Sequence, residues 1–301
     1  MDGFAVENVN KGLPPISIDS STFLKEQFVL PMLPSTVMQI LQVVHSDVGG
    51  AAQVTELIGR DASMVSHILR VVNSAYYALP KQIANLQHAV AYIGLGEVSR
   101  ICLTLSVINT LKPKDKKELQ HFWLHSYLCA LIAKRLVREY RNVGEIGDLY
   151  AAALLHDIGK LVYTRFFPDH YTEMRRYCAT YGRFLVDAEQ HYSLPSHMTF
   201  GALLCDHWNL PSTVKRACES HELQDLKVFK SRPDATPFEL VVIVSNLIAA
   251  LATDFLEESL KEEVTTEIKS CLGIGKEELV KFLGDVYELK LKAETTIGPM
   301  I

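Results

Sequence analysis

The chain reads Leu154-Leu155-His156-Asp157-Ile158-Gly159-Lys160 at the point that decides its fold. This run places an imidazole and a carboxylate side by side within an otherwise apolar helical pattern. Burying a carboxylate without a partner costs free energy or shifts its pKa, so the fold must compensate Asp157. A divalent metal ion would do this, and so would Lys160, which is within reach along a helix. The sequence leaves both interpretations open: a metal site, or a buried hydrogen bond with Asp157 paired to Lys160.

Candidate companions of the pair lie on other predicted helices. His125 falls in the stretch 119–140, where apolar residues recur at helical spacing and predict an amphipathic helix. The later stretch 238–251 is almost wholly apolar except for Ser245 and Asn246. Two further candidate histidines, His197 and His221, lie between these stretches. Four separate helices would then each bring an imidazole or an amide toward one interior point: those of His125, His197, His221 and Asn246.

Each of these residues also has a plain structural interpretation. His125 can be a core histidine whose ring is satisfied by a carbonyl group. His197 can simply open a helix after Ser196, which is a typical N-cap residue. His221 is as well explained as a bystander as it is as a ligand. Glu189, eight residues before His197, is expected to be an exposed charge.

Several motifs upstream and downstream, in this order, resemble one family. The run 69–77 contains Asn73-Ser74-Ala75, the run 154–160 is the one quoted above, and Trp208-Asn209-Leu210-Pro211 precedes Ser220-His221. Together with Leu33-Pro34 and the run 89–96, they are similar to the HDOD family, a branch of the HD superfamily of metal-dependent phosphohydrolases. The resemblance covers about Phe28 to Glu222.

The resemblance implies an all-α fold of two helical lobes. We expect a flexible arm over residues 1–19, an N-terminal helical lobe over 20–117, and an HD-like helical lobe with a C-terminal helical extension over 118–301. Family members are helical signalling modules, and most are thought to be regulatory. The resemblance therefore implies a bacterial signal-transduction module that acts through protein partners and is not catalytic. The alternative is a metal-dependent phosphohydrolase acting on a nucleotide, a cyclic dinucleotide or another phosphate ester.

Two departures from the active relatives bear on this choice. Those relatives have paired histidines where this chain has Ser220-His221, and a carboxylate where it has Ser245-Asn246. An amide oxygen can bind a cation but brings no charge, so the substitution weakens a site for hard divalent ions. The ligand set that remains for one ion of Fe, Mn, Zn or Ni is His125, His156, Asp157 and Asn246, with His197 and His221 as secondary candidates. If the chain is an enzyme, Asp157 and Lys160 are the candidate catalytic residues.

Composition narrows the class of protein. The net charge is −5 over 301 residues, with 48% hydrophobic residues, which is typical of a globular core and argues against a general nucleic-acid surface. The six cysteines form no Cys-x-x-Cys pair, which favours a reducing compartment. The start of the sequence lacks the pattern of a signal peptide. The sequence contains no long uninterrupted apolar run, so no membrane span is expected. We therefore expect a cytoplasmic protein.

Local signals place some of the helix ends. Asp61 is a predicted N-cap for a helix over 62–73, and a further helix is predicted over 86–93. Pro168 is expected to end a turn. The stretch 171–181 is predicted to be a helix with Arg175 and Arg176 pointing outward. Residues 293–301 are expected to fray.

Overall fold

The computed structural model describes residues 13–16, 34–44, 50–74, 77–111, 115–139 and 149–297. Within these ranges every regular element is an α-helix and none is a strand, so the all-α prediction is confirmed. The helices are α2 (Ser35–Val44), α3 (Ala51–Gly59), α4 (Ala62–Val72), α5 (Leu86–Ile93), α6 (Leu95–Thr110), α7 (Lys116–Glu139), α8 (Leu149–Leu155), α9 (Ile158–Phe166), α10 (Pro168–Tyr181), α11 (Leu185–His191), α12 (His197–His207), α13 (Ser212–Glu219), α14 (Leu223–Phe229), α15 (Pro237–Thr253), α16 (Glu258–Leu272) and α17 (Lys276–Ile297).

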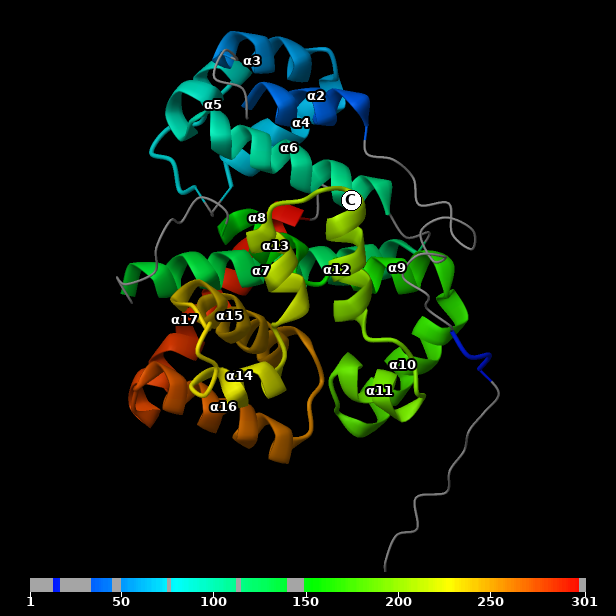
Figure 1. Ribbon diagram of the computed structural model, residues 1–301. Helices are drawn as coiled ribbons and strands as arrows, with labels where there is room; N and C mark the ends of the chain where they lie inside the picture. Colours follow the sequence, from blue (N-terminus) through cyan, green and yellow to red (C-terminus); the bar gives the residue numbers. More distant parts are fainter. Residues whose placement is uncertain are drawn as a thin grey trace, which may run out of the picture.

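Helices α2 to α6 pack against one another and lie above the long helix α7 in Figure 1. The predicted N-cap is confirmed, because the Asp61 side chain accepts a hydrogen bond from the Met64 amide at 3.0 Å. The helix predicted over 86–93 is also confirmed as α5. Helix α6 contacts α8, which connects this group of helices to the part that holds the His156-Asp157 pair.

Helix α7 crosses the middle of the molecule and contacts α8, α15 and α17 (Figure 1). Every residue from His125 to Ala133 is buried, so this part of α7 is covered on all sides. The amphipathic pattern predicted for 119–140 holds only toward the two ends of the stretch, where Gln120 and Arg138 are exposed. A helix that is apolar all around belongs to the interior. His125 therefore lies in the core.

Helix α15, which carries Asn246, is fixed at its N-terminus by Glu239. Thr236 and Glu239 form a reciprocal capping box, and the Glu239 carboxylate also accepts hydrogen bonds from Arg216 at 2.9 Å and Arg232 at 3.1 Å. Arg232 in turn donates to the Ser220 hydroxyl at 3.1 Å, next to His221. This network joins the start of α15 to the segment that carries His221.

Two predicted ends differ from the structure. Pro168 does not end a turn but occupies the first turn of α10, where its missing N–H costs nothing. Helix α17 continues to Ile297, so the predicted fraying from residue 293 is wrong as far as 297, and residues 298–301 lie outside the described part. Most of the arm predicted over 1–19 also lies outside it; in the described piece, the Pro14 carbonyl accepts a hydrogen bond from His170 Nε2 at 2.8 Å.

Within the described residues, no single helix has the length and apolarity to cross a membrane. Helices α5 and α6 reach that threshold only when they are counted together, and they meet at an angle of 119°.

The Glu239 network generates a prediction about stability. Burial works against the charge of Glu239, but hydrogen bonds from Thr236 and the charge of Arg216 outweigh it and lower its pKa below 4.5. A carboxyl with a depressed pKa stabilises the fold above the unfolded-state pKa and loses this contribution as the pH falls through the folded-state pKa. We expect Glu239→Gln to lower the free energy of unfolding by about 2 kcal/mol at pH 7.

This difference from the wild type should shrink as the pH is lowered below 4.5, and urea denaturation monitored by circular dichroism at several pH values measures it. Glu258→Gln, which changes an exposed glutamate at the start of α16, is the matched control and should have little effect. A Glu239→Gln penalty that does not depend on pH would contradict the role given to its charge.

Candidate metal centre

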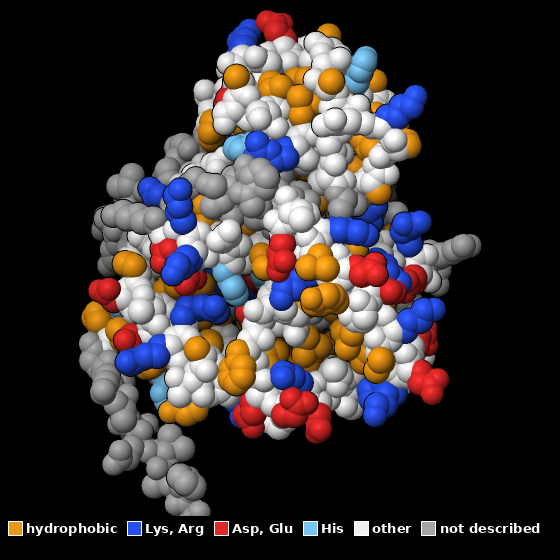
Figure 2. Space-filling view, turned by 180° about the vertical axis from the view of Figure 1, so that it is seen from behind, with side chains coloured by type: hydrophobic (Ala, Val, Ile, Leu, Met, Phe, Trp, Pro, Cys, Tyr) orange, Lys and Arg blue, Asp and Glu red, His pale blue; other side chains and the backbone are white. Residues whose placement is uncertain are grey.

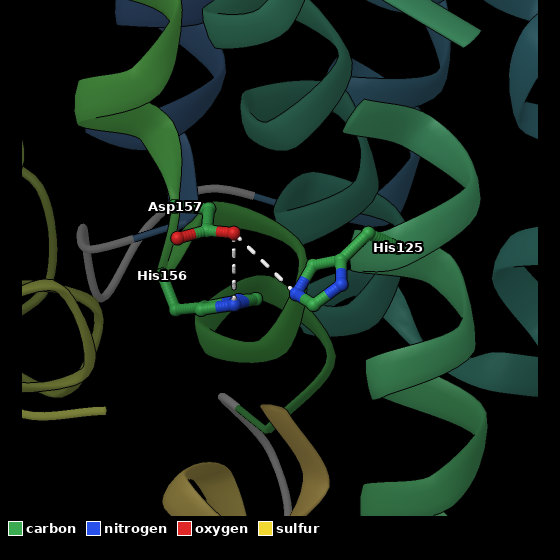
Figure 3. A group of neighbouring side chains, drawn as sticks. All are labelled: His125, His156 and Asp157. Atoms are coloured by element: carbon green, nitrogen blue, oxygen red, sulfur yellow. Dashed lines mark ion pairs between the residues drawn. The ribbon is translucent and has the colours of Figure 1, made fainter. Parts of the chain in front are cut away.

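The His156-Asp157 pair lies in the turn between α8 and α9, not within a helix. Helix α8 ends at Leu155 and α9 begins at Ile158, and the Asp157 backbone has φ −95° and ψ 12°. The sequence pattern looked continuously helical because the chain is helical and apolar on both sides of the turn. Figure 3 shows the consequence: the side chains of both residues lie close to His125, which comes from the neighbouring helix α7.

Gly159 allows the start of α9 to lie directly against the start of α12. A Cβ atom at this position would lie 1.8 Å from the His197 carbonyl oxygen, which no side chain can tolerate. The glycine therefore sets the distance between the turn that holds Asp157 and the helix that holds His197.

Three groups approach one carboxylate oxygen of Asp157. Its Oδ2 atom lies 3.4 Å from Nε2 of His125, 3.4 Å from Nε2 of His156 and 2.6 Å from Nζ of Lys160 (Figure 3 shows the two histidines). Asp157 is only 2% exposed. The predicted ion pair with Lys160 is present. A carboxylate oxygen has two lone pairs, so Oδ2 can accept from Lys160 and still bind a second group.

The outer ring nitrogens fix the orientation of both imidazoles. His156 Nδ1 lies 2.8 Å from the Ala153 carbonyl oxygen, which can only accept a hydrogen bond, so Nδ1 carries the proton. His125 Nδ1 lies 3.4 Å from the Thr253 hydroxyl, whose own proton is donated to the Ala249 carbonyl at 2.9 Å. His125 Nδ1 is thus also the donor. In the neutral form, both Nε2 atoms present lone pairs to the interior, as metal-binding histidines do.

Asn246 adds a further acceptor at the same point. Its Nδ2 donates to the His221 carbonyl oxygen at 2.7 Å, which assigns the orientation of the amide. Its Oδ1 then faces Nε2 of His125 at 2.9 Å and Nε2 of His156 at 3.2 Å. The reverse orientation would set Oδ1 against another carbonyl oxygen.

These contacts bring lone pairs together without a proton between them. Nε2 of His125, Nε2 of His156 and Oδ1 of Asn246 are all acceptors, and Lys160 bonds only to Asp157. Ligand atoms about 2.1 Å from a common ion lie about 3.0 Å apart at right angles and about 3.4 Å apart at the tetrahedral angle. The separations of 2.9 to 3.4 Å are close to these values. The donor set therefore fits a divalent cation.

The other carboxylate oxygen faces a second group. Asp157 Oδ1 has no hydrogen-bond partner in the described part of the structure and lies 3.5 Å from His197 Nε2 and 3.3 Å from His221 Nε2. The two Nε2 atoms are 3.0 Å apart. Glu222 Oε1 lies 3.4 Å from the first and 3.7 Å from the second. The groups His125–His156–Asp157 and Asp157–His197–His221 thus share one carboxylate.

Glu189 distinguishes the second group from the first. It is 1% exposed, so the expectation of an exposed charge is wrong, and its Oε1 accepts from the His197 amide at 2.9 Å and from His197 Nδ1 at 2.8 Å. His221 Nδ1 donates to the Ala217 carbonyl at 2.8 Å, so its Nε2 is an acceptor. A proton on His197 Nε2 therefore has three acceptors around it: His221, Asp157 and Glu222. A proton on His197 Nε2 can therefore act as the hydrogen-bond donor for the lone pairs of the second group.

The pKa shifts of the buried groups also differ between the two sides of Asp157. Burial lowers the pKa of His125 to about 4, which keeps it neutral at pH 7. Burial also opposes a charge on His197, but the charge of Glu189 outweighs it and raises the pKa of His197 well above its usual value. Burial works against the ionised form of Asp157 too, yet Lys160 and His156 hold its pKa well below the usual range. Asp157 is therefore an anion.

The structure brings all the candidate residues of the sequence to one place. His125, His156 and Asn246 lie on the Oδ2 side of Asp157, and His197 and His221 lie on the Oδ1 side. Sequence reasoning missed Glu222 as part of the second group. Its position directly after His221 was the available signal.

The close approach at Gly159 gives a second prediction. Gly159→Ala forces α9 and α12 apart, and we expect it to lower the free energy of unfolding by about 3 kcal/mol or to abolish folding. Gly284→Ala is the matched control, because a Cβ there meets nothing within 4 Å and the residue lies in helix α17. That control should be neutral or slightly stabilising. Chemical denaturation measures both, and equal stability of the two variants would contradict the packing described here.

Comparisons with known proteins identify the family of this chain. The HDOD domain family model matches residues 30–223. An "Uncharacterized protein" of Treponema pallidum (strain Nichols) is 24% identical over 89% of this chain, and the chain spans 50% of that relative's length. A crystal structure from Shewanella amazonensis SB2B, named "Putative phosphohydrolase", has a TM-score of 0.67 at 20% identity, covering 92% of this chain and 98% of that one.

A further crystal structure, from Marinobacter aquaeolei VT8 and named "Putative signal transduction protein", has a TM-score of 0.64 at 18% identity and covers 90% of this chain and 59% of that one. At these identities the two structures show that the fold is shared. The family match extends over more than half of the chain and includes the His156-Asp157 turn. The chain belongs to the HDOD domain family.

Proposed function

We propose that this protein is a regulatory signal-transduction module of HDOD type, whose HD-like centre holds one divalent ion and which acts through protein partners. The observation that carries the proposal is the convergence of His125, His156 and Asn246 on one point with lone pairs only, beside Oδ2 of Asp157. These nitrogen and oxygen donors suit Fe, Mn, Zn or Ni, and the ion would join α7, the α8–α9 turn and α15.

The two groups around Asp157 differ in a way that favours one ion. On the Oδ2 side Lys160 donates only to Asp157, so no proton donor lies between His125, His156 and Asn246, and a divalent cation would satisfy their lone pairs. On the Oδ1 side a proton on His197, balanced by Glu189, satisfies His221 and Glu222. Two-metal hydrolysis needs both ions to clamp the attacking and leaving oxygens, so a site with one ion and one proton supports a structural or regulatory role.

The proposal includes the division into two lobes at residues 117 and 118 and a cytoplasmic location. Helices α2 to α6 would then form the partner-binding lobe. In support, a shallow groove between α3 and α5 is lined by small and apolar residues such as Gly59, Val90 and Ala91, and Tyr92 beside it is 60% exposed. The relative named for signal transduction supports a signalling role, since that structure has the same fold.

The alternative is a metal-dependent phosphohydrolase, and one observation favours it: Asp157 and Lys160 line a cavity that is open to solvent. A bound divalent ion would polarise a phosphoryl oxygen and acidify water there. Lys160, held beside Asp157, would neutralise charge on the phosphoryl group, and Asp157 would orient it. The name of the Shewanella amazonensis structure is consistent with this alternative.

A titration with metal tests the proposal. We expect the 301-residue chain to bind about one Mn²⁺ or Zn²⁺ per chain by metal analysis after dialysis. An ion present at a hundred times its Kd should stabilise the fold by about 2.7 kcal/mol, which thermal denaturation detects. His156→Ala should abolish both effects, because it removes a ligand from the acceptor cluster. His88→Ala, at an exposed histidine of α5, is the matched control and should keep both.

Two results would contradict the proposal. The first is a wild-type protein that gains no stability from any divalent ion, which would leave Lys160 and the neighbouring imidazoles to compensate the buried charge of Asp157. The second is metal-dependent hydrolysis of a cyclic dinucleotide or nucleotide that His156→Ala eliminates and His88→Ala retains. That result would replace the regulatory module by the phosphohydrolase.

A further inference from the structure

Helix α17 carries two apolar stripes, and only one of them is buried. The buried stripe recurs at helical spacing on the side of α17 that contacts α7 and α15, and it consists of Leu279, Phe282, Val286 and Ala293. One apolar stripe is enough to hold an amphipathic helix on a core. The helix also lies beyond residues 30–223, which match the family. The second stripe therefore needs an explanation that belongs to this chain.

The second stripe lies on the outer face of α17. Val280, Tyr287 and Leu291 are 60%, 64% and 47% exposed, and they are three of the seven large hydrophobic side chains exposed in the described residues. Gly284 lies between them, and a Cβ atom there would meet nothing within 4 Å. The four positions are spaced by four, three and four residues, which is the spacing of a coiled-coil seam. A large exposed apolar stripe of this kind marks a contact surface.

Figure 1 places α17 at the lower left of the molecule, so it lies on the right in the reverse view of Figure 2. In the lower right part of Figure 2, hydrophobic side chains are exposed among acidic and basic ones. An apolar patch with a charged rim is the usual composition of a protein–protein contact.

The stripe is complementary to itself when it is reversed. In an antiparallel pair of copies with a two-fold axis between residues 285 and 286, Val280 of one copy faces Leu291 of the other. Tyr287 then faces Gly284 of the second copy, so each ring lies over a position without a side chain. In a parallel pair every residue would meet its own twin, and ring would face ring. The pattern therefore favours an antiparallel second copy of this chain.

The charges beside the stripe agree with this direction. Lys281 and Glu288 are exposed, lie two helical turns apart on the same side of the stripe, and make no ion pair within the described residues. In the antiparallel pair, Lys281 of each copy comes close to Glu288 of the other. Glu277 and Glu294, at the two ends of the stripe, would approach each other and so limit the contact to the residues between them.

We propose that residues 280–291 of α17 form the interface of a homodimer in which two copies of the chain pair antiparallel along this helix. Burial of Val280, Tyr287 and Leu291 drives the association, and the two Lys281–Glu288 pairs set its direction. The inference goes beyond the proposed function, because no residue of the metal centre lies in α17.

The size of the stripe limits the strength of the dimer. Standard protein–protein interfaces use roughly 20–30 residues on each side, and this stripe with its flanking charges has fewer. We therefore expect a Kd on the order of 10–100 μM. At concentrations far below this Kd the chain is monomeric, so chemical denaturation of Gly284→Ala reports on the helix alone.

Sedimentation equilibrium of the 301-residue chain, from well below to well above this Kd, tests the proposal. We expect a monomer–dimer equilibrium in the wild type. Tyr287→Ser should raise the Kd at least about tenfold, because a buried tyrosine at the centre of an interface contributes strongly to binding. Circular dichroism shows whether the variant is folded, and the exposure of Tyr287 predicts that it is.

Tyr181→Ser is the matched control and should dimerise like the wild type. Tyr181 is 58% exposed at the end of α10, whose outer face is polar. On that face Arg176 pairs with Glu173, as predicted. Arg175 was also expected to point outward, and this is wrong, because it is half-buried and lines the cavity beside Asp157. No apolar stripe therefore accompanies Tyr181.

Charge reversal tests the identity and direction of the second copy. Lys281→Glu places two glutamates together at each end of the antiparallel pair, and Glu288→Lys places two lysines together. Each single variant should weaken the dimer about threefold to tenfold, the range for exposed ion pairs replaced by like charges. The double variant Lys281→Glu/Glu288→Lys restores opposite charges and should dimerise like the wild type.

Three results would overturn the proposal. The first is a wild type that stays monomeric at the highest concentration, which would leave the stripe to a different protein. The second is equal dimerisation of the wild type and Tyr287→Ser, which would place the interface elsewhere. The third is a double charge variant that dimerises no better than either single variant, since antiparallel pairing requires that it recover.

Discussion

The buried carboxylate of Asp157 is the constraint on which the centre of this molecule depends. An ionised carboxylate at 2% exposure must be compensated by groups that the fold holds in place, because removing one partner of a buried charge costs about 3–5 kcal/mol. Here one oxygen faces α7 and Lys160, and the other faces α12 and the segment before α14. Elements far apart in the chain therefore meet where this charge is balanced.

Backbone carbonyl groups orient two of the imidazole rings in this centre. Carbonyl groups of Ala153 and Ala217 each accept the outer proton of an imidazole and turn its other nitrogen inward. Glu189, an anion, replaces the carbonyl at His197, and this one difference separates the two sides of Asp157. At His125 and His156 both outer nitrogens face neutral acceptors, so both inner nitrogens present lone pairs that a cation would satisfy. On the other side the carboxylate of Glu189 holds the outer nitrogen of His197, so a proton on its inner nitrogen can satisfy the lone pair of His221.

The sequence predicted much of this centre but not its details. The apolar patterns around His125 and Asn246, with the family resemblance, placed both residues in one interior, and the structure brings them within 2.9 Å. The turn at His156 was not predicted. Apolar residues flank it on both sides, and a turn of only two residues does not interrupt their helical spacing enough to be seen in the sequence. The burial of Glu189 and the direction of Arg175 were also missed. Whether a charged residue faces the interior depends on partners from distant elements, which local patterns do not contain.

Anomalous diffraction from crystals grown with Mn²⁺ and recorded near the manganese edge addresses the central claim most directly. The account predicts one strong anomalous peak, between Nε2 of His125, Nε2 of His156, Oδ2 of Asp157 and Oδ1 of Asn246, with no comparable peak between His197 and His221. An empty first position, with the three acceptors moved apart and Asp157 bound only by Lys160, would contradict it. Two peaks of equal height on either side of Asp157 would contradict the division between ion and proton.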